Sequence, residues 1–353
     1  MSASVEAVRA LLGAHLGPAA SAMTLSQGPS QGPAASGEQR RAAFVARDGS
    51  GALDIHLYPA SEREAARREE AGLTLGGAVG LAPALVFAGE AAPAAGPAAG
   101  PAAGFDPGAW LIVAQAPGGE PLGQRPLTDA EVDSWLFLLL TLHHLRPALA
   151  NQPSSMSADL SGWWTRQQPA WETCRAAYGG AATQPLLRAL TQLHAITQVR
   201  IETNRALWAG VERRPCHGDP IPPHLIEDGA RLTLMEWSGF GLGDPAIEVA
   251  RVAALAALTE QITSAQYTRF IAAYLDGMRD LRDATLAERL RLFASVAPMG
   301  FALATLAALA QPGAIPPRAR RGLLAQVARA LIWSQEALGL RFDPPAALLA
   351  PLG

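Results

Sequence analysis

The chain contains only two cysteines, Cys174 and Cys216, among its 353 residues. Two cysteines provide neither the disulfide framework of a small secreted protein nor a zinc signature, so we expect both thiols to be reduced and structural. Neither positive nor negative charge is in large excess, because the formal net charge is −3. The totals therefore lack the basic footprint that nucleic-acid binding requires, and we expect no nucleic-acid partner.

The first residues lack the positive, apolar and small-residue pattern of a secretory signal. One run without charge, Leu292 to Ala310, has the length of a membrane span. Pro298 and Gly300 interrupt this run, which favours a buried helix of a soluble protein. We therefore expect a cytoplasmic protein with no membrane partner, and the sequence leaves its oligomeric state open.

Hydrophobic residues make up 49% of the chain, which excludes global disorder. The length suits one large or two ordinary domains with a sizeable core. Low complexity is confined to residues 91–104, where prolines and glycines block helix formation between the alanines. This segment is predicted to be a surface loop without a binding role.

The first third of the chain carries regular helix and strand signals. Apolar residues from Val5 to Leu16 have helical spacing that Gly17-Pro18 stops. The turn Asp48-Gly49-Ser50-Gly51 separates two strand-like runs and predicts a hairpin. We expect a helix within residues 1–20 and strands at 41–47 and 52–59. A helix at 61–72 should begin with a Ser61–Glu64 capping box, and further helices are expected around 132–143 and 186–194.

The most informative segment runs from Pro215 to Arg251. It contains a His-Gly-Asp turn, then a hydrophobic hairpin that leads to Met-Glu-Trp, and then Gly-Asp-Pro followed by an acidic residue. The residues are His217, Gly218 and Asp219; Met235, Glu236 and Trp237; and Gly243, Asp244, Pro245 and Glu248. This order of elements resembles the catalytic core of the aminoglycoside phosphotransferase and choline kinase family.

The resemblance implies an α+β, protein-kinase-like fold of two lobes, with a small antiparallel β-sheet lobe and a larger, mainly helical lobe. It divides the chain into an N-terminal helix in 1–20, a small lobe in 21–116 that includes the 91–104 loop, and a helical large lobe in 117–353 that carries the His-Gly-Asp loop. The implied activity is phosphoryl transfer from ATP, with Mg²⁺, to a hydroxyl group of a small molecule.

Within this resemblance, Asp219 is the catalytic residue that accepts or orients the substrate proton, and His217 braces its turn. Two residues expected to hold magnesium are changed: His224 stands in the place of an asparagine, and Glu236 stands in the place of an aspartate. Imidazole suits zinc, copper, iron or nickel better than magnesium. Glu236 still offers a carboxylate to a metal. For His224, packing under the cleft and a weak metal or phosphate contact both stay open.

A third departure concerns the nucleotide. Kinases carry a lysine on the third strand that contacts the phosphates and pairs with a helix glutamate. The corresponding position here is His56, which should be only partly charged at neutral pH. Glu69 is the candidate for the helix glutamate, and Gln115 with Ala116 marks the hinge expected to contact adenine through backbone groups. The small, turn-rich segment Ser26 to Gly32 is a weak candidate for the phosphate-covering loop.

Two functions therefore stay open. The first is a kinase for a hydroxylated small molecule, with Asp219 as base and Glu236 as metal ligand. The second is a pseudokinase that binds a small ligand or a partner. The indoles of Trp163, Trp164 and Trp171 beside Glu172 suggest an amine as one candidate ligand, held by cation–π attraction. Core packing or a lobe contact explains the same indoles.

Overall fold

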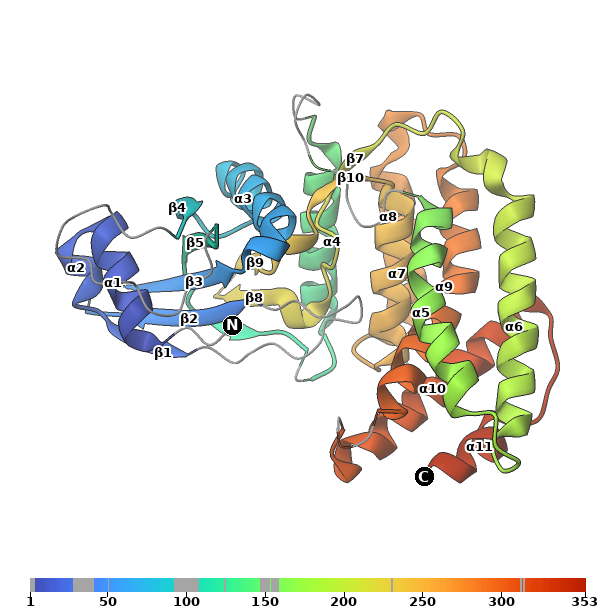
Figure 1. Cartoon of the computed structure of the whole chain (residues 1–353). Helices are drawn as coiled ribbons and strands as arrows, with labels where there is room; N and C mark the ends of the chain where they lie inside the picture. The colour runs from blue at the N-terminus through green and yellow to red at the C-terminus, as the bar shows by residue number, and fades with distance from the viewer. Residues whose placement is uncertain are drawn as a thin grey trace. The chain divides into compact units, whose positions relative to one another are not determined.

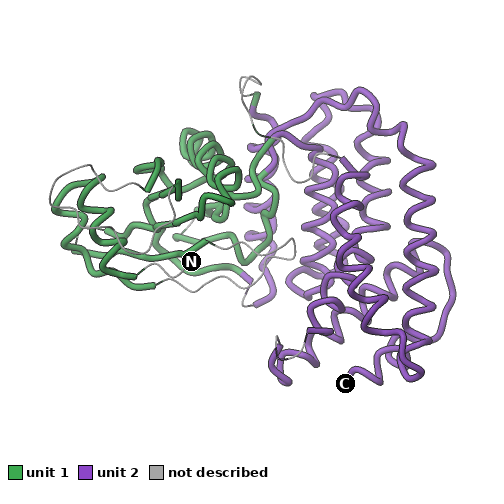
Figure 2. Tube along the Cα trace, in the orientation of Figure 1, with its two compact units in different colours: residues 1–122, 146–155, 217–241 green, residues 123–145, 156–216, 242–353 purple. Residues whose placement is uncertain are grey.

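The computed structural model divides the chain into two compact units (Figure 2). The structure describes residues 4–27, 41–49, 51–91, 108–123, 125–146, 153, 159–229, 231–311, 313 and 315–353. Unit 1 comprises Met1–Leu122, Arg146–Ser155 and His217–Gly241, and unit 2 comprises Gly123–Leu145, Met156–Cys216 and Leu242–Gly353. The His-Gly-Asp segment thus groups with the strands of unit 1, whereas the sequence analysis assigned it to the helical lobe. Residues 28–32 and 92–104, which the sequence analysis predicts as loops, lie outside the described residues.

A five-stranded antiparallel sheet in the order β1-β2-β3-β5-β4 forms the centre of unit 1 (Figure 1). Its strands are β1 (Thr24–Gln27), β2 (Ala42–Arg47), β3 (Ala52–Tyr58), β4 (Leu85–Glu90) and β5 (Trp110–Gln115). The predicted hairpin is confirmed, since β2 pairs with β3 and the Asp48 N–H donates to the Gly51 carbonyl at 3.0 Å.

Side-chain alternation gives β3 one apolar face and one polar face. Ile55 and Leu57 are fully buried in a core with residues of the helix α1 (Val5–Leu16), which ends at Gly17 as predicted. The short helix α2 (Pro18–Ser21) follows α1. The even-numbered residues from Asp54 to Tyr58 point to the opposite face and are all polar. A polar face on a central strand requires polar partners, and α3 provides them.

The helix α3 (Arg63–Ala78) contacts β3, β4 and β5. The predicted capping box between Ser61 and Glu64 is wrong. A 3₁₀ turn at Ala60–Glu62 precedes the helix, so Glu62 occupies the N-cap position without a side-chain cap hydrogen bond. Ser61 lies inside this turn and is therefore not in a position to cap the helix.

A second sheet in unit 1 supports the His-Gly-Asp segment. Its order is β6-β8-β9, formed by β6 (Glu120–Pro121), β8 (Leu225–Asp228) and β9 (Arg231–Leu234). β8 and β9 form the predicted hydrophobic hairpin. At the open end of this hairpin, the N–H of Met235, directly after β9, donates to the carbonyl of His224, directly before β8, at 2.8 Å. This bond brings the backbones of His224 and Glu236 close together.

Unit 2 is helical apart from two short strands, β7 and β10. The first residue of β10, Gly241, is assigned to unit 1, and its other two residues belong to unit 2. The elements of unit 2 are α4 (Asp129–His144), α5 (Leu160–Ala177), α6 (Gln184–Thr203), β7 (Arg214–Cys216), β10 (Gly241–Gly243), α7 (Pro245–Leu258), α8 (Ser264–Gly277), α9 (Leu286–Leu309), α10 (Pro317–Leu338) and α11 (Pro345–Leu349). Figure 1 shows α5, α6, α7 and α9 running alongside one another.

The helix α9 contributes most of its side chains to the core of unit 2 and contacts α5, α7 and α10. Gly300 allows close packing with α5, because a Cβ at this position would lie 2.5 Å from the Trp163 ring. Among the described residues, α9 is the one helix whose length and composition would permit a membrane span, and 72% of its apolar window is buried within the protein. This agrees with the predicted buried helix.

Asp244 of the Gly-Asp-Pro element has a structural role in unit 2. Its side chain accepts a hydrogen bond from the Ala246 N–H at 2.9 Å and so caps α7. The guanidinium of Arg289, which is fully buried, donates to Asp244 at 2.8 Å and to Asp283 at 2.8 Å. Asp244 therefore fixes α7 to α9.

Trp237 fixes the Met-Glu-Trp segment to α3 within unit 1. The indole is fully buried, and its N–H donates to the Leu234 carbonyl at 2.8 Å. Its ring lies against Gly72 and Gly76, where an added Cβ would approach ring atoms to 2.7 and 2.9 Å. Both glycines are required because the ring occupies the space of a side chain.

We predict opposite effects of alanine at two adjacent glycines of α3. Gly76→Ala should destabilise the protein by about 1–3 kcal/mol, because the new methyl group overlaps Trp237 and Ala82. Gly77→Ala should be neutral or stabilising by up to about 1 kcal/mol, because its nearest neighbour would be 3.4 Å away. Urea unfolding followed by circular dichroism measures both. Equal effects of the two substitutions would contradict this packing.

Candidate functional site

The His-Gly-Asp turn is held by the imidazole of His217, which is fully buried. Its Nε2–H donates to the Met235 carbonyl at 2.7 Å, and its Nδ1 accepts from the Asp219 N–H at 3.2 Å. Both ring nitrogens therefore bond to backbone, which is the geometry of a brace. Gly218 has a φ of 94°, and a Cβ at this residue would overlap the carbonyl of Gly239. Glycine is the residue that fits this turn.

Asp219 has a partly accessible side chain, 31% exposed, and lies next to His224. The Nδ1 of His224 is 2.8 Å from the Asp219 carbonyl oxygen and 3.5 Å from its Oδ2. Because a carbonyl oxygen only accepts, Nδ1 carries the hydrogen, and the lone pair of neutral imidazole is then on Nε2. His224 thus braces the Asp219 turn and presents Nε2 as a potential ligand atom.

Glu236 adopts a left-handed backbone conformation, with a φ of 67° and a ψ of 52°. This region is uncommon for a residue other than glycine, and such residues cluster at functional sites. Its neighbours His217 and Trp237 hold the backbone in place, with their rings 4.5 Å apart. The Glu236 carboxylate forms an ion pair with Arg41.

Arg41 is the residue that the sequence analysis did not identify, beyond placing it in a strand. Its side chain is 6% exposed and lies between two carboxylates: Nη1 is 3.3 Å from Glu69, and Nη2 pairs with Glu236. Nη1 also donates to the Tyr58 oxygen at 3.0 Å, while the Tyr58 hydroxyl donates to Glu69. Arg41 directly precedes β2, so its guanidinium reaches the glutamate of α3 from the start of β2 rather than from the position of the usual lysine on β3.

His56 lies 2.6 Å from the Glu69 carboxylate through Nδ1 and 3.4 Å from Asp54 through Nε2. Burial and the neighbouring Arg41 charge oppose its protonation, but Glu69 and Asp54 outweigh both and raise the pKa of His56 to about 10. Although burial opposes ionisation of Glu69, His56 and Arg41 lower its pKa to about 2. The expectation of a partly charged His56 is therefore wrong, because two carboxylates keep this imidazole cationic.

The hinge residues Gln115 and Ala116 have their N–H groups engaged in unit 1. Gln115 donates to the Ala84 carbonyl, and Ala116 donates to the Ala52 carbonyl, each at 2.9 Å. The next residue is Pro117, which has no N–H group. An adenine contact at this hinge would therefore need carbonyl groups or side chains.

The donor set of this site differs from the all-oxygen set that magnesium prefers. Asp219 and Glu236 offer carboxylates, and His224 offers Nε2 in the tautomer set by its bond to Asp219. Imidazole suits zinc, copper, iron or nickel better than magnesium, whereas carboxylates suit both magnesium and manganese. The ligand atoms of Asp219, His224 and Glu236 do not all lie within 4.8 Å of one another, and the ion pair with Arg41 holds the Glu236 carboxylate.

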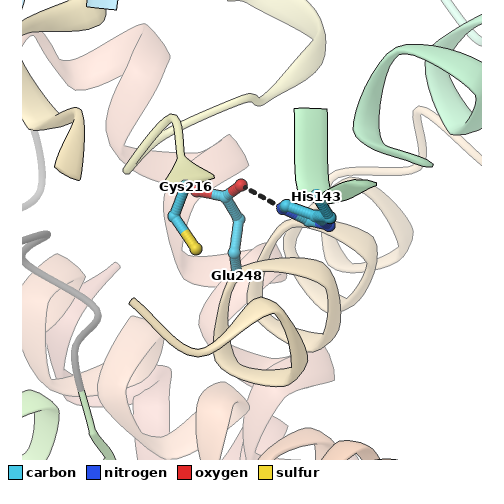
Figure 3. A group of neighbouring side chains, drawn as sticks. All are labelled: His143, Cys216 and Glu248. Carbon is cyan, nitrogen blue, oxygen red and sulfur yellow. Dashed lines mark hydrogen bonds and ion pairs between the residues drawn. The ribbon is translucent and has the colours of Figure 1, made fainter. Parts of the chain in front are cut away.

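A second group of potential ligands, His143, Cys216 and Glu248, lies in unit 2 (Figure 3). Their potential ligand atoms lie within 4.8 Å of one another. The imidazole is already bonded on both sides, at 2.7 Å to the Tyr274 hydroxyl and at 3.0 Å to Glu248. Burial, with the charges of Glu248 and Asp244, raises the pKa of the Cys216 thiol well above its usual value. A protonated thiol is a poor ligand, so we interpret this group as a hydrogen-bonded core network.

The predicted indole cluster belongs to the core of unit 2. Trp163 stacks edge-on against Phe293, and Trp171 stacks on His194 at a centroid distance of 4.5 Å. The Trp164 N–H donates to Gln198 at 2.6 Å. All three indoles are buried. Among the explanations left open for the three indoles, the structure supports core packing rather than an amine site.

The fold and the site together define a class of protein. The sheet order, the buried helix glutamate on its polar face and the braced His-Gly-Asp turn are the parts of a protein-kinase-like phosphotransferase. The sequence model of the phosphotransferase enzyme family matches residues 33–285, and the chain belongs to this family.

Solved structures agree on the fold. Plasmodium vivax ethanolamine kinase is similar with a TM-score of 0.56 and 11% identity, over 90% of this chain and 86% of that chain. A thermostable mutant of the aminoglycoside phosphotransferase APH(4)-Ia has a TM-score of 0.52 and 13% identity, over 93% and 97%. Spectinomycin phosphotransferase APH(9)-Ia, in complex with ADP and spectinomycin, has a TM-score of 0.50 and 12% identity, over 92% and 91%. A search of curated protein sequences finds no match. The predicted α+β kinase-like fold is confirmed.

The buried pair of His56 and Glu69 predicts a specific pH dependence of stability. The folded pKa of His56, about 10, exceeds its ordinary 6.5, so its contribution is complete below pH 6.5 and is lost as the pH rises through 10. The folded pKa of Glu69, about 2, is below its ordinary 4.5, so its contribution is complete above pH 4.5 and is lost towards pH 2. Both contributions are complete together between pH 4.5 and 6.5.

We expect His56→Gln to reduce the free energy of unfolding by about 3–5 kcal/mol in that window, because it leaves Glu69 buried with one partner fewer. The deficit relative to the natural protein should shrink above neutral pH. Glu70→Gln, at the next residue of α3, is the control and should change stability little at any pH. A deficit that stays constant between pH 6.5 and 10 would contradict a cationic His56.

Proposed function

We propose that the protein is an ATP-dependent phosphotransferase that acts on a hydroxyl group of a small molecule. Membership of the phosphotransferase family supports this proposal. The observation that carries it is the guanidinium of Arg41, which bonds to both Glu69 and Glu236. Phosphoryl transfer depends on a fixed positive charge near the phosphates, and Arg41 supplies one in the absence of the usual lysine.

Arg41 suits the task of holding phosphate. A guanidinium is always charged and presents several N–H donors in a planar fork, which matches phosphate oxygens in a bidentate manner. Glu69 and Tyr58 fix its orientation from the polar face of the sheet. The cationic His56 lies beside Arg41, with its Nδ1 3.2 Å from Nη1, and keeps Glu69 ionised. His56 is thus a positioning residue for Arg41.

Asp219 is the proposed base. Its side chain is accessible, and its backbone is fixed from two sides by His217 and His224. In this position it accepts or orients the proton of the acceptor hydroxyl. Glu236 and His224 are the residues that would hold a divalent ion, which when bound offsets the negative charge of the nucleotide phosphates.

The free-energy cost of burying charges also favours a catalytically active site over a binding module without phosphotransferase activity. Burying charges is expensive, and apolar replacements of buried ion pairs are often neutral or stabilising. This site nevertheless buries Arg41, His56 and Glu69, with Glu236 at 10% exposure. Their joint presence is best explained by use in binding phosphate.

The test is ATP turnover with hydroxylated small molecules as acceptors, with Mn²⁺ and Mg²⁺ compared. We expect ADP formation that depends on an acceptor. Asp219→Asn should reduce it by about 100-fold or more, the range for a lost general base. Asp228→Asn, which changes an exposed carboxylate of β8, is the control and should leave it unchanged. ATP binding without acceptor-dependent turnover, or turnover that survives Asp219→Asn, would contradict the proposal.

A second prediction concerns Arg41. Arg41→Gln should weaken ATP binding about tenfold or more, because a charged donor to phosphate is worth roughly 1.5–3 kcal/mol. Arg47→Gln, at the exposed end of the same strand, provides the matched control. Arg41→Lys keeps the positive charge between Glu69 and Glu236, so it should fold even if Arg41→Gln does not. It should bind ATP with intermediate affinity. Isothermal titration calorimetry on folded variants measures all three. Unchanged affinity in Arg41→Gln would show that another group holds the phosphates.

A further inference from the structure

A cavity of about 580 Å³ opens in the helical unit, at the start of α5 and the end of α6. Its wall includes Leu160, Ile201, Trp208, Val211 and two arginines. The volume is within the range of small-molecule pockets. All of its lining residues belong to unit 2, and none of them is a residue assigned to phosphate or metal.

The two carboxylates in the wall already have hydrogen-bond partners, and Asp244 also has an ion-pair partner. Asp244 is 1% exposed and accepts from Arg289 at 2.8 Å and from the Trp208 indole N–H at 2.7 Å. Asp159 accepts from the Gly162 N–H at 2.6 Å as the cap of α5. Asp244 is therefore not available to a cationic ligand, and one oxygen of Asp159 is used in the helix cap.

The two arginines in the wall, Arg205 and Arg213, are exposed. Within the part of the chain that the structure describes, no carboxylate pairs with either of them. Arg214 provides the contrast, since its guanidinium is buried and pairs with Glu212 at 2.5 Å. The cavity thus has two positive charges that its own acidic residues do not neutralise.

The rest of the wall is apolar. Trp208 is half-buried, and its N–H is committed to Asp244, so the part of the indole that lines the cavity offers ring surface. Leu160, Ile201 and Val211 add aliphatic surface. A wall of this kind complements a ligand with a hydrophobic or ring-shaped body.

We infer that this cavity binds a small organic anion, in which a carboxylate or phosphate group meets Arg205 and Arg213 and an apolar body packs against Trp208. Guanidinium groups bind both kinds of anion through paired N–H donors. The inference does not depend on the proposed phosphotransferase activity. It predicts a negatively charged ligand for unit 2, whereas an amine would be positively charged.

Calorimetry with phenyl phosphate tests the inference, in the presence of saturating ADP so that the nucleotide site is filled. The natural protein should bind phenyl phosphate, and it should bind phenyltrimethylammonium, the cationic counterpart, at least about tenfold more weakly. Inorganic phosphate should also bind more weakly, because it lacks the ring that faces Trp208.

The double variant Arg205→Gln/Arg213→Gln should weaken phenyl phosphate binding by about tenfold or more. The control Arg188→Gln/Arg318→Gln removes two exposed arginines elsewhere in unit 2 and should change the Kd less than twofold. Circular dichroism verifies that both variants fold. No binding of phenyl phosphate, equal binding of the cationic probe, or binding that survives the Arg205→Gln/Arg213→Gln change would overturn the inference. Loss of ATP turnover alone would leave it standing.

Discussion

The central constraint on unit 1 is the neutralisation of buried carboxylates. Asp54, Glu69 and Glu236 lie largely out of water on one face of the sheet, and unpaired buried charges cost several kcal/mol each. Arg41 and His56 provide the compensating cations. The polar face of β3, the position of α3 and the left-handed backbone of Glu236 all serve this arrangement, because each brings one charged group to the same place.

The identity of the central cation follows from the same constraint. The chain contains no lysine, and all 28 of its basic residues are arginine. A lysine ammonium is a single compact charge, whereas a guanidinium can bond to two carboxylates along different edges. Arg41 does so, with Nη1 towards Glu69 and Nη2 towards Glu236. Placing Arg41 at the start of β2 leaves the β3 position to His56, whose Nδ1 contacts the second oxygen of Glu69 and helps to keep this carboxylate ionised.

Much of this architecture is visible in the sequence, because it depends on local patterns. The β2–β3 hairpin, the charged helix and the His-Gly-Asp turn each have a spacing that predicts them. Arg41 could not be assigned in this way, since its role depends on pairing between distant residues. One signal was available: with Ala42 paired to Leu57, Arg41 falls on the same face as His56 and the other even-numbered residues of β3. The charge of His56 was missed for a related reason, because its pKa depends on carboxylates from two different elements.

Within the proposed function, the pairing of Arg41 with Glu236 couples the nucleotide to the metal. The guanidinium holds the carboxylate that would bind the ion, so either ligand must break the same ion pair before it binds. Phosphate oxygens that engage Arg41 would release Glu236, and a metal that takes Glu236 would free Arg41 for phosphate. Each ligand thus lowers the cost of binding the other, and this coupling is reciprocal by thermodynamic necessity. A site that lacks the usual lysine can therefore bind phosphate and metal together, because the Arg41–Glu236 ion pair breaks when both ligands bind.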